Sequence, residues 1–176
     1  HVYSEKPLTL SLKDGLALKK LATAKRVKIG SAPDTILGGS HQLARKAIDD
    51  GTVGRITAGT AAVLSHGMES WHPNPDFFFK PGGGPVLDMG PYYIANLINL
   101  LGPVRRVGAL TSMAEKHRTI TSQPRAGEKI KVTTPTNIQA LLEFASGATI
   151  TLLASWDVWA NRQPHMDLYG TEGSLY

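Results

Sequence analysis

The hydrophobic and polar positions divide the chain into a small strand–helix–strand unit, a mainly helical middle and a strand-rich second half. Residues 1–6 alternate in polarity and stop at Pro7, which predicts a strand. Ser11, followed by Asp14 three residues later, is typical of a capping box at a helix N-terminus. The expected buried side of this helix consists of leucines: Leu12, Leu16, Leu18 and Leu21. Residues 26–31 predict a second strand, so this region is expected to form a βα unit of a parallel sheet.

The middle of the chain predicts two amphipathic helices separated by a strand and a loop. Apolar residues at positions 43, 44, 47 and 48 favour a helix that ends at Gly51. Residues 54–65 are rich in Ala, Val and Thr and predict a long strand. Residues 66–80 combine prolines with aromatic side chains, which indicates a loop that presents side chains rather than a helix or strand.

The stretch PGGGPVLDMGPYYIANLINLLG, residues 81–102, predicts the second of these helices, with Gly84 as N-cap and Pro85 in its first turn. At helical spacing one face is mostly apolar: Leu87, Gly90, Ile94, Leu97, Ile98 and Leu101. The opposite face is polar: Asp88, Tyr92, Asn96 and Asn99. Pro91 removes one backbone hydrogen bond, so we expect a kink or a loose turn there. The polar face is a candidate wall of a catalytic pocket.

The second half predicts consecutive strands over residues 104–118, 136–144, 148–156 and from 166 to 169. Ser146 and Gly147, between two of these strands, are typical of a hairpin turn. Strands that follow one another without intervening helices favour an antiparallel sheet. The whole pattern therefore predicts an α/β fold, in the α+β arrangement once the first unit has ended.

Composition narrows the class of protein further. The chain has 176 residues, no cysteine and no apolar run of about 18 residues, so we expect neither a disulfide framework nor a transmembrane helix. Its net charge of +5 lies in residues 1–30, which hold seven basic and two acidic groups (7 − 2 = +5), while the remaining chain holds 12 of each. No aromatic side chains are interleaved with these lysines, so a solvated helix face explains the charge better than a nucleic-acid partner. We expect a cytoplasmic protein without nucleic-acid or membrane partners. Because the chain opens on HVYSEKP, which reads as the middle of a strand, we also expect it to be part of a longer protein.

Two groups of residues could carry chemistry, although each has an ordinary structural explanation. Lys6 is expected at the carboxyl edge of a parallel sheet, where open α/β sheets bind ligands, and a surface lysine is the alternative. Asp88 and Tyr92 lie one helical turn apart, and a solvated helix face is the alternative. No G-x-G-x-x-G follows a strand, and the glycines at 82–84 lack the Gly-Lys-Ser/Thr ending of a phosphate loop. His66 and His72 lie six residues apart in a loop, and we expect no metal site.

These pieces in this order closely resemble the Gfo/Idh/MocA family, named for glucose–fructose oxidoreductase, inositol dehydrogenase and a rhizopine-catabolism protein. The resemblance rests on Glu5-Lys6-Pro7 and, roughly 80 residues later, on GGGPVLDMGPYY. The segments ARKAIDDGTVGRI, LLGPVRRV and YGTEGSL fit as well, so the resemblance covers essentially the whole chain.

The resemblance implies an NAD(P)-dependent oxidoreductase of two domains. Residues 1–32 would be the C-terminal end of an NAD(P)-binding Rossmann domain. Residues 33–176 would form most of a C-terminal α/β domain with an open, mostly antiparallel sheet, which would pair with other subunits in a homodimer or homotetramer. The cofactor would be NAD or NADP, and the substrate would be a sugar, a polyol or a cyclitol.

The resemblance also assigns roles to residues of the two motifs. Lys6 would lie by the nicotinamide and the reacting hydroxyl, with Glu5 and Pro7 beside the cofactor. Asp88 would orient Lys6 or a substrate hydroxyl. Tyr92 would be the acid/base, at a position where most relatives have histidine and the glucose–fructose oxidoreductase branch has tyrosine. A free phenol loses its proton only near pH 10, so a nearby cation such as Lys6 would have to favour the phenolate.

Three further side chains are candidates for binding a sugar-like substrate. Trp71 could stack on a sugar face, while His72 in the same loop and Asn96 on the helix could bind hydroxyl groups. For each of them, packing or simple surface exposure is the alternative.

Two functions remain open at this level. The first is an NAD(P)-dependent dehydrogenase or reductase that acts on CH–OH groups. The second is a non-catalytic regulatory or sensor protein that binds a dinucleotide on the same fold. The tyrosine at position 92 motivates this alternative, because it departs from the commoner histidine.

Overall fold

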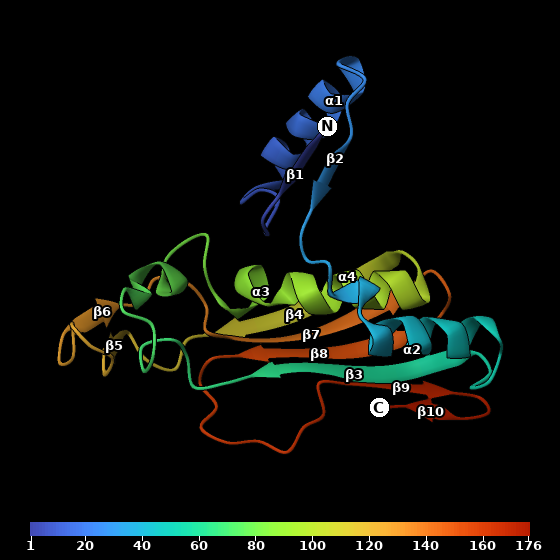
Figure 1. Cartoon of the computed structure of the whole chain (residues 1–176). Helices are drawn as coiled ribbons and strands as arrows, with labels where there is room; N and C mark the ends of the chain where they lie inside the picture. The colour runs from blue at the N-terminus through green and yellow to red at the C-terminus, as the bar shows by residue number, and fades with distance from the viewer.

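A six-stranded sheet with helices on one face forms the body of the molecule, and a smaller strand–helix–strand unit stands above the helices (Figure 1). The computed structural model describes all 176 residues. The small unit consists of β1 (Val2–Ser4), α1 (Leu12–Ala24) and β2 (Ile29–Ser31). The helices of the body are η1 (Thr35–Leu37), α2 (Gly39–Asp49), η2 (Pro75–Phe79), α3 (Pro85–Asp88) and α4 (Gly90–Leu101). Its strands are β3 (Ile56–Leu64), β4 (Val104–Ser112), β5 (His117–Thr119), β6 (Lys129–Lys131), β7 (Asn137–Phe144), β8 (Thr149–Ser155), β9 (Met166–Gly170) and β10 (Ser174–Leu175).

The small unit has the predicted parallel pairing and the predicted helix cap. Strands β1 and β2 run parallel. The Asp14 main-chain N–H donates to Ser11 Oγ at 3.1 Å, and the Ser11 hydroxyl donates to the Asp14 carboxylate at 2.7 Å. These bonds satisfy groups that a helix N-terminus otherwise leaves without partners, so helix α1 begins where the sequence predicts.

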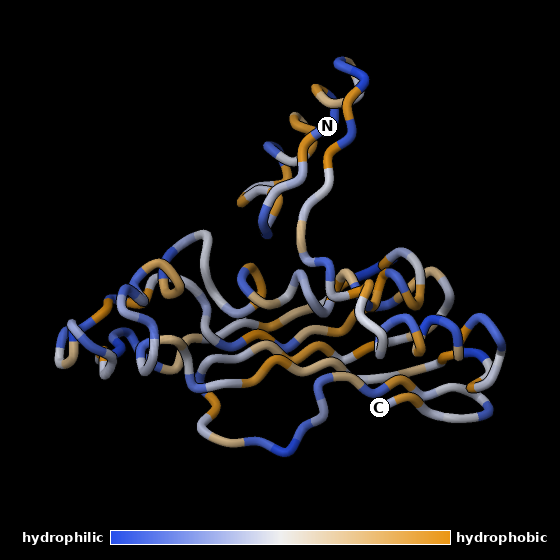
Figure 2. The backbone as a smooth tube through the Cα atoms, in the orientation of Figure 1, coloured by the Kyte–Doolittle hydropathy of each residue, from blue (hydrophilic) through white to orange (hydrophobic).

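The prediction that the leucines of α1 form a buried face is wrong for this chain. These four leucines are exposed by 37–78%, and Ala22 is the one buried residue of the helix. The reason is that a two-stranded sheet is too small to cover them and no other element of the chain packs on this face. Figure 2 shows the resulting apolar stretches on this unit, away from the body.

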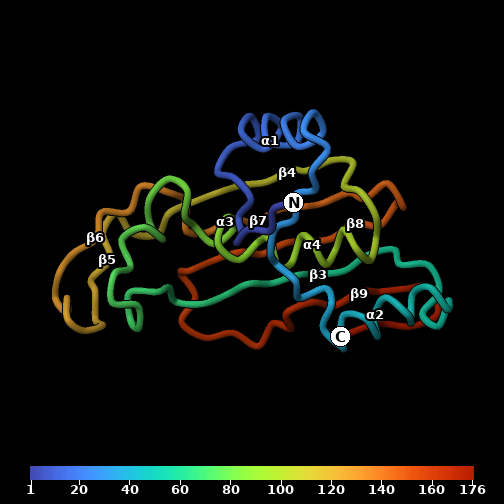
Figure 3. The backbone as a smooth tube through the Cα atoms, turned by 45° about the horizontal axis from the view of Figure 1, so that its top comes forward, coloured from blue at the N-terminus to red at the C-terminus, as the bar shows by residue number.

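The order of strands in the large sheet is β10-β9-β3-β8-β7-β4. Every neighbouring pair is antiparallel except β3 and β8, so the prediction of a mostly antiparallel sheet is confirmed. Gly147, at φ +91°, makes the tight turn between β7 and β8, also as predicted. Helix α4 runs over the middle of this sheet (Figure 3), and the core between them includes Leu97, Leu142 and Ile150.

The predicted single strand over residues 104–118 is wrong in its second part. Strand β4 stops at Ser112, whose partner Asn137 is the first residue of β7. Beyond that point the edge strand has no neighbour to pair with, so the chain leaves the sheet. It then forms a separate hairpin of β5 and β6, which packs on a second apolar cluster around Phe79 and Trp156.

The predicted kink near Pro91 is confirmed as a break between α3 and α4 at Met89. The break resets the phase of the helix, so the predicted faces are partly wrong. Asn96, expected on the polar face, is only 3% exposed, whereas Ile98, expected in the core, is 45% exposed. Tyr92 donates its main-chain N–H to the Met89 carbonyl at 3.1 Å and begins the new helix in a tight turn.

The sheet face opposite the helices is largely uncovered. Leu110 is 82% exposed and Leu141 is 56% exposed, and the pairing register places both side chains on this face. The prediction of an open sheet is therefore confirmed. None of the helices has the length and the apolar character needed to cross a membrane.

Candidate active site

The glycine-rich turn before α3 places that helix against the neighbouring 3-10 helix η2. The Gly84 main-chain N–H donates to the Phe78 carbonyl at 2.8 Å, and Gly84 has a φ of +87°. A Cβ on Gly83 would lie 2.5 Å from the carbonyl oxygens of Phe77 and Phe78. Glycine is therefore required at position 83 by close backbone approach and at position 84 by conformation. The turn fixes the start of α3 and with it the position of Asp88.

Lys6 and Asp88, 82 positions apart in the sequence, form an ion pair where the small unit meets the body. The Lys6 ammonium donates to Asp88 Oδ1 at 2.7 Å and to the Asp88 main-chain carbonyl at 2.5 Å. Their side chains are 15% and 20% exposed. Two oxygens of one residue thus hold the ammonium, and the break after Asp88 leaves that carbonyl beside it.

Tyr92 lies next to this pair. The Lys6 Nζ atom lies 5.2 Å from the centroid of the Tyr92 ring, within the range of a cation–π interaction. The structure therefore brings together the three residues that the resemblance assigns to catalysis, although their roles stay predictions. Glu5 precedes them on the surface and accepts a hydrogen bond from the Lys6 main-chain N–H at 3.1 Å, and Pro7 is partly buried.

A cavity of about 340 Å³ opens beside Tyr92. Its polar lining comes from four separate parts of the chain: Thr35, His41, Tyr92, Tyr93, Asn96 and His165. Met89 and Met166 complete the lining, which contains no Asp, Glu, Lys or Arg. The volume is at the small end of the range of ligand sites, roughly 300–1,000 Å³.

Helix α4 holds one histidine at each of two positions of the cavity wall. The Asn96 side-chain amide donates to His41 Nδ1 at 2.7 Å. One turn earlier, the Tyr93 hydroxyl and His165 Nδ1 share a hydrogen bond of 3.1 Å. Burial raises the pKa of Tyr93, so this phenol keeps its proton at neutral pH.

The predicted substrate-binding residues fall in two places. Asn96 lines the cavity, where it holds His41. Trp71 and His72 do not line it. Trp71 is 63% exposed and lies edge-on to the His72 ring, while His72 packs against Phe78. His72 Nδ1 also accepts from the Asn74 main-chain N–H, which gives this side chain a structural partner.

His41, Tyr93 and His165 are the lining residues that sequence reasoning missed. Tyr93 follows Tyr92 directly, but the family motif assigns a role to Tyr92 alone. His41 and His165 are lone histidines, 124 positions apart, with no motif around either. Only the pairing of β9 with β3 brings the second histidine to the helix layer, so no local signal could have joined them.

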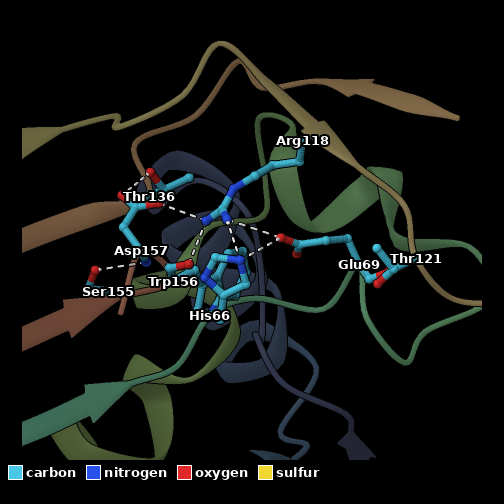
Figure 4. Close-up of polar contacts among 8 residues, drawn as sticks. All are labelled: His66, Glu69, Arg118, Thr121, Thr136, Ser155, Trp156 and Asp157. Carbon is cyan, nitrogen blue, oxygen red and sulfur yellow. Dashed lines mark hydrogen bonds and ion pairs between the residues drawn. The ribbon is translucent and has the colours of Figure 1, made fainter. Parts of the chain in front are cut away.

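A second polar cluster lies at the far end of the sheet, around Arg118 (Figure 4). The Arg118 guanidinium donates to Glu69 Oε1 at 3.0 Å and to Asp157 Oδ1 at 2.7 Å, and all three side chains are at least 86% buried. His66 lies 3.5 Å from the same guanidinium. The cluster joins β5 to the loops that follow β3 and β8. Because its arginine is already paired with two carboxylates, it is a cross-link between segments rather than a second candidate for the catalytic site.

Comparisons with known proteins agree with this architecture. A family model of the GFO/IDH/MocA C-terminal domain matches residues 41–176. The chain is 26% identical over 146 residues to the dTDP-3,4-didehydro-2,6-dideoxy-alpha-D-glucose 3-reductase of Streptomyces antibioticus, which is 82% of this chain and 42% of that protein.

Two solved structures extend the agreement to the fold. An NAD-binding oxidoreductase from Klebsiella pneumoniae superposes with a TM-score of 0.83 at 27% identity, over 100% of this chain and 47% of that one. Levoglucosan dehydrogenase in complex with NADH and L-sorbose has a TM-score of 0.79 at 24% identity, over 99% and 46% of the two chains, and supports the fold alone. The chain thus spans less than half the length of each of these three proteins.

Proposed function

The chain belongs to the Gfo/Idh/MocA family, and from this premise we propose that it carries the substrate side of an NAD(P)-dependent oxidoreductase. The proposed reaction transfers a hydride between the nicotinamide and a carbinol or ketone carbon of a sugar, a polyol or a cyclitol. The observation that carries the proposal is the meeting of Lys6, Asp88 and Tyr92 beside a cavity of about 340 Å³.

The chain's own residues are proposed to handle the proton of the reaction. A bound nicotinamide supplies or accepts the hydride. Oxidation of an alcohol also removes a proton from its oxygen, and Tyr92 in its phenolate form accepts that proton. The Lys6 ammonium lies over the Tyr92 ring, and Asp88 holds the ammonium in place.

The division into domains is part of the same proposal. Residues 1–32 are proposed to be the end of an NAD(P)-binding Rossmann domain, and residues 33–176 most of the substrate domain. Two features support this division: the parallel pairing of β1 with β2, and the leucines that α1 leaves exposed. Lys6 follows β1 at the carboxyl end of this parallel pair, where ligands of such sheets bind, so Glu5, Lys6 and Pro7 fit a position beside the cofactor.

The substrate class and the cofactor come from the site and from the relatives together. The relatives include a protein crystallised with NADH and L-sorbose and a reductase of a nucleotide-linked sugar. The cavity here is of small-molecule size, and polar side chains such as His41 and His165 stand in a largely apolar lining, which suits a neutral ligand with hydroxyl groups. We propose that the cofactor is NAD or NADP and that the substrate is sugar-like. The proposed location of the protein is the cytoplasm.

Turnover assays on the complete protein test the proposal. Nicotinamide absorbance is followed with NAD and with NADP against a panel of sugars, polyols and cyclitols in both directions. Reduction or oxidation of the cofactor with at least one member is expected. Tight binding of the cofactor without any turnover would favour the second candidate, a dinucleotide sensor, which the tyrosine at position 92 motivates.

The open sheet is proposed as the surface that joins subunits into a dimer or tetramer. Exposed apolar side chains such as Leu110 and Leu141 on a sheet face with no covering layer support this assignment.

A further inference from the structure

The cavity beside Tyr92 has two imidazoles in its wall, and the same helix face holds both. Asn96 and Tyr93 are three residues apart on α4, so they lie next to each other on its surface. Each uses its polar group to bind the Nδ1 atom of one histidine, His41 or His165. The two rings are therefore positioned side chains rather than mobile surface groups.

The partner of His41 determines which of its nitrogens carries the proton. A carboxamide nitrogen can only donate, so His41 Nδ1 accepts and the proton of the neutral ring is on Nε2. The same amide nitrogen also faces the Met166 sulfur at 3.6 Å, an acceptor, which supports this orientation of the amide. His41 Nε2 has no hydrogen-bond partner within the chain, so one residue of the cavity lining keeps an unpaired N–H donor.

His165 has the complementary property. Its Nδ1 is bonded to the Tyr93 hydroxyl. When that hydroxyl donates, His165 Nε2 carries the ring proton and donates, and when the hydroxyl accepts, His165 Nε2 accepts. A hydroxyl group on a ligand matches either state, because a hydroxyl is both a donor and an acceptor. The two imidazoles therefore suit a ligand that offers hydroxyl groups.

The absence of charged side chains from the cavity lining restricts the class of ligand further. None of the residues around the cavity is an Asp, Glu, Lys or Arg, and Lys6, which lies over the Tyr92 ring, is already paired with Asp88. A carboxylate or phosphate that entered this cavity would lose its hydration without gaining a cation, which is unfavourable. A neutral group would enter without that penalty.

We propose that His41 and His165 are specificity-determining residues that select an uncharged, hydroxyl-bearing sugar or cyclitol and disfavour sugar acids and sugar phosphates. The inference rests on the proposed function and deepens it. His41 donates from Nε2 to a ligand oxygen, Asn96 acts as the positioning residue that sets its tautomer, and His165 contacts a second hydroxyl.

Paired probes and paired variants test the inference in the complete protein with NADH bound. The neutral probes are D-glucose, D-galactose and myo-inositol, and the acids are D-glucuronate and D-galacturonate. Dissociation constants from calorimetry are combined with kcat and KM for every probe that is turned over. Each hexose is expected to bind at least about tenfold more tightly than its acid.

The variants distinguish loss of the His41 Nε2 donor from loss of the imidazole ring itself. In His41→Asn the amide oxygen can replace Nδ1 toward Asn96, but the Nε2 donor is lost, so the neutral probes are expected to bind roughly tenfold more weakly with kcat nearly unchanged. In His41→Gln the amide nitrogen can replace the Nε2 donor, so binding is expected to stay within about threefold of wild type. His165→Arg adds a cation and is expected to tighten binding of the acids about tenfold or more. His117→Asn, a histidine outside this cavity, is the matched control and is expected to behave as wild type.

The outcomes distinguish the two proposals. If wild type binds and turns over a probe while His41→Asn and His165→Arg leave every constant unchanged, the specificity assignment is overturned and the proposed function stands. Tighter binding of the acids by wild type also overturns the assignment. If no probe is bound or turned over in the presence of cofactor, both proposals fail.

Discussion

Lys6 is held by two oxygens of Asp88, one from the side chain and one from the main chain. The main-chain oxygen is available because α3 ends at Asp88 and α4 starts at Gly90. The ammonium therefore lies at one place over the Tyr92 ring, although lysine is a flexible side chain. A proton-transfer site needs this kind of positioning, because a displacement of about 1 Å can reduce a rate by a large factor.

Variants of this pair test the catalytic assignment directly. Lys6→Met and Tyr92→Phe in the complete protein are each expected to lower kcat by about 10²-fold or more, because each removes a group needed for proton transfer. Circular dichroism should show an unchanged fold. Tyr169→Phe, a partly exposed tyrosine on β9, is the matched control and should retain full activity. Near-normal turnover in both test variants would contradict the roles assigned to them.

Gly83 shows how a single position can control the geometry of the site. A methyl group there would meet two backbone carbonyls at 2.5 Å, and backbone atoms cannot move aside as the end of a side chain can. Gly83→Ala is therefore expected to lower the free energy of unfolding by about 1–3 kcal/mol. Denaturant titration measures the change. Gly108→Ala on β4, where a Cβ would meet nothing within 4 Å, should stay within about 0.5 kcal/mol of wild type. Equal effects in the two variants would show that close approach is not the cause.

At the scale of elements, the Arg118 cluster joins segments that the sheet alone does not connect. Strand β5 belongs to a separate two-stranded sheet, and it meets the large sheet through contacts that include the Arg118 bonds to Glu69 and Asp157. The cluster also leaves no room for a larger residue at position 67, because a Cβ on Gly67 would lie 2.4 Å from Glu69 Oε2. The position of the hairpin of β5 and β6 thus depends on buried charge pairing as well as on apolar packing.

Arg118→Met is expected to destabilise the protein by about 3–5 kcal/mol, because it leaves two buried carboxylates without their cation. Thermal and denaturant unfolding measure the loss. Arg106→Met is the matched control, since Arg106 pairs with Glu143 on the surface with its side chain 76% exposed, and its loss should leave the stability close to that of wild type. A cost below about 1 kcal/mol for Arg118→Met would show that the buried carboxylates find other partners.

At the scale of the whole molecule, two apolar surfaces remain uncovered, and they are of different kinds. The leucines of α1 belong to a helix whose own sheet has only two strands. Leu110 and Leu141 belong to a complete sheet that lacks a second layer. In the proposed protein the first surface is covered by the rest of the cofactor-binding domain, and the second by another subunit.

The second of these assignments has a simple test. Leu110→Asp places a charge in the centre of the proposed interface, and the complete protein is expected to shift toward the monomer in sedimentation velocity measurements. Leu43→Asp, at a similarly exposed leucine on helix α2, is the matched control and should leave the mass unchanged. An unaltered oligomer in the Leu110 variant would exclude this face as the main contact.

The sequence by itself determined the elements whose signals are local. Periodicity and turn chemistry were sufficient for the helix cap at Ser11, the glycine turn before α3, the break near Pro91 and the hairpin at Gly147. Such features depend on hydrogen bonds and dihedral preferences between residues a few positions apart, which a pattern of side chains records directly. The resemblance to a family then named Lys6, Asp88 and Tyr92 as a group.

Only the tertiary structure decided what surrounds that group. From periodicity, the strand that became β4 was predicted to continue past Ser112, where its partner strand β7 begins. Periodicity also predicted an exposed Asn96 and a buried Ile98, and both are wrong because the break after α3 shifts the phase of the helix. The histidines of the cavity wall bind helix α4, and Arg118 binds its two carboxylates, across 39 to 72 positions of sequence. Contacts over such separations are set by the order and direction of strands in the sheet. Since that order depends on the packing of all layers together, no single segment of the sequence contains it.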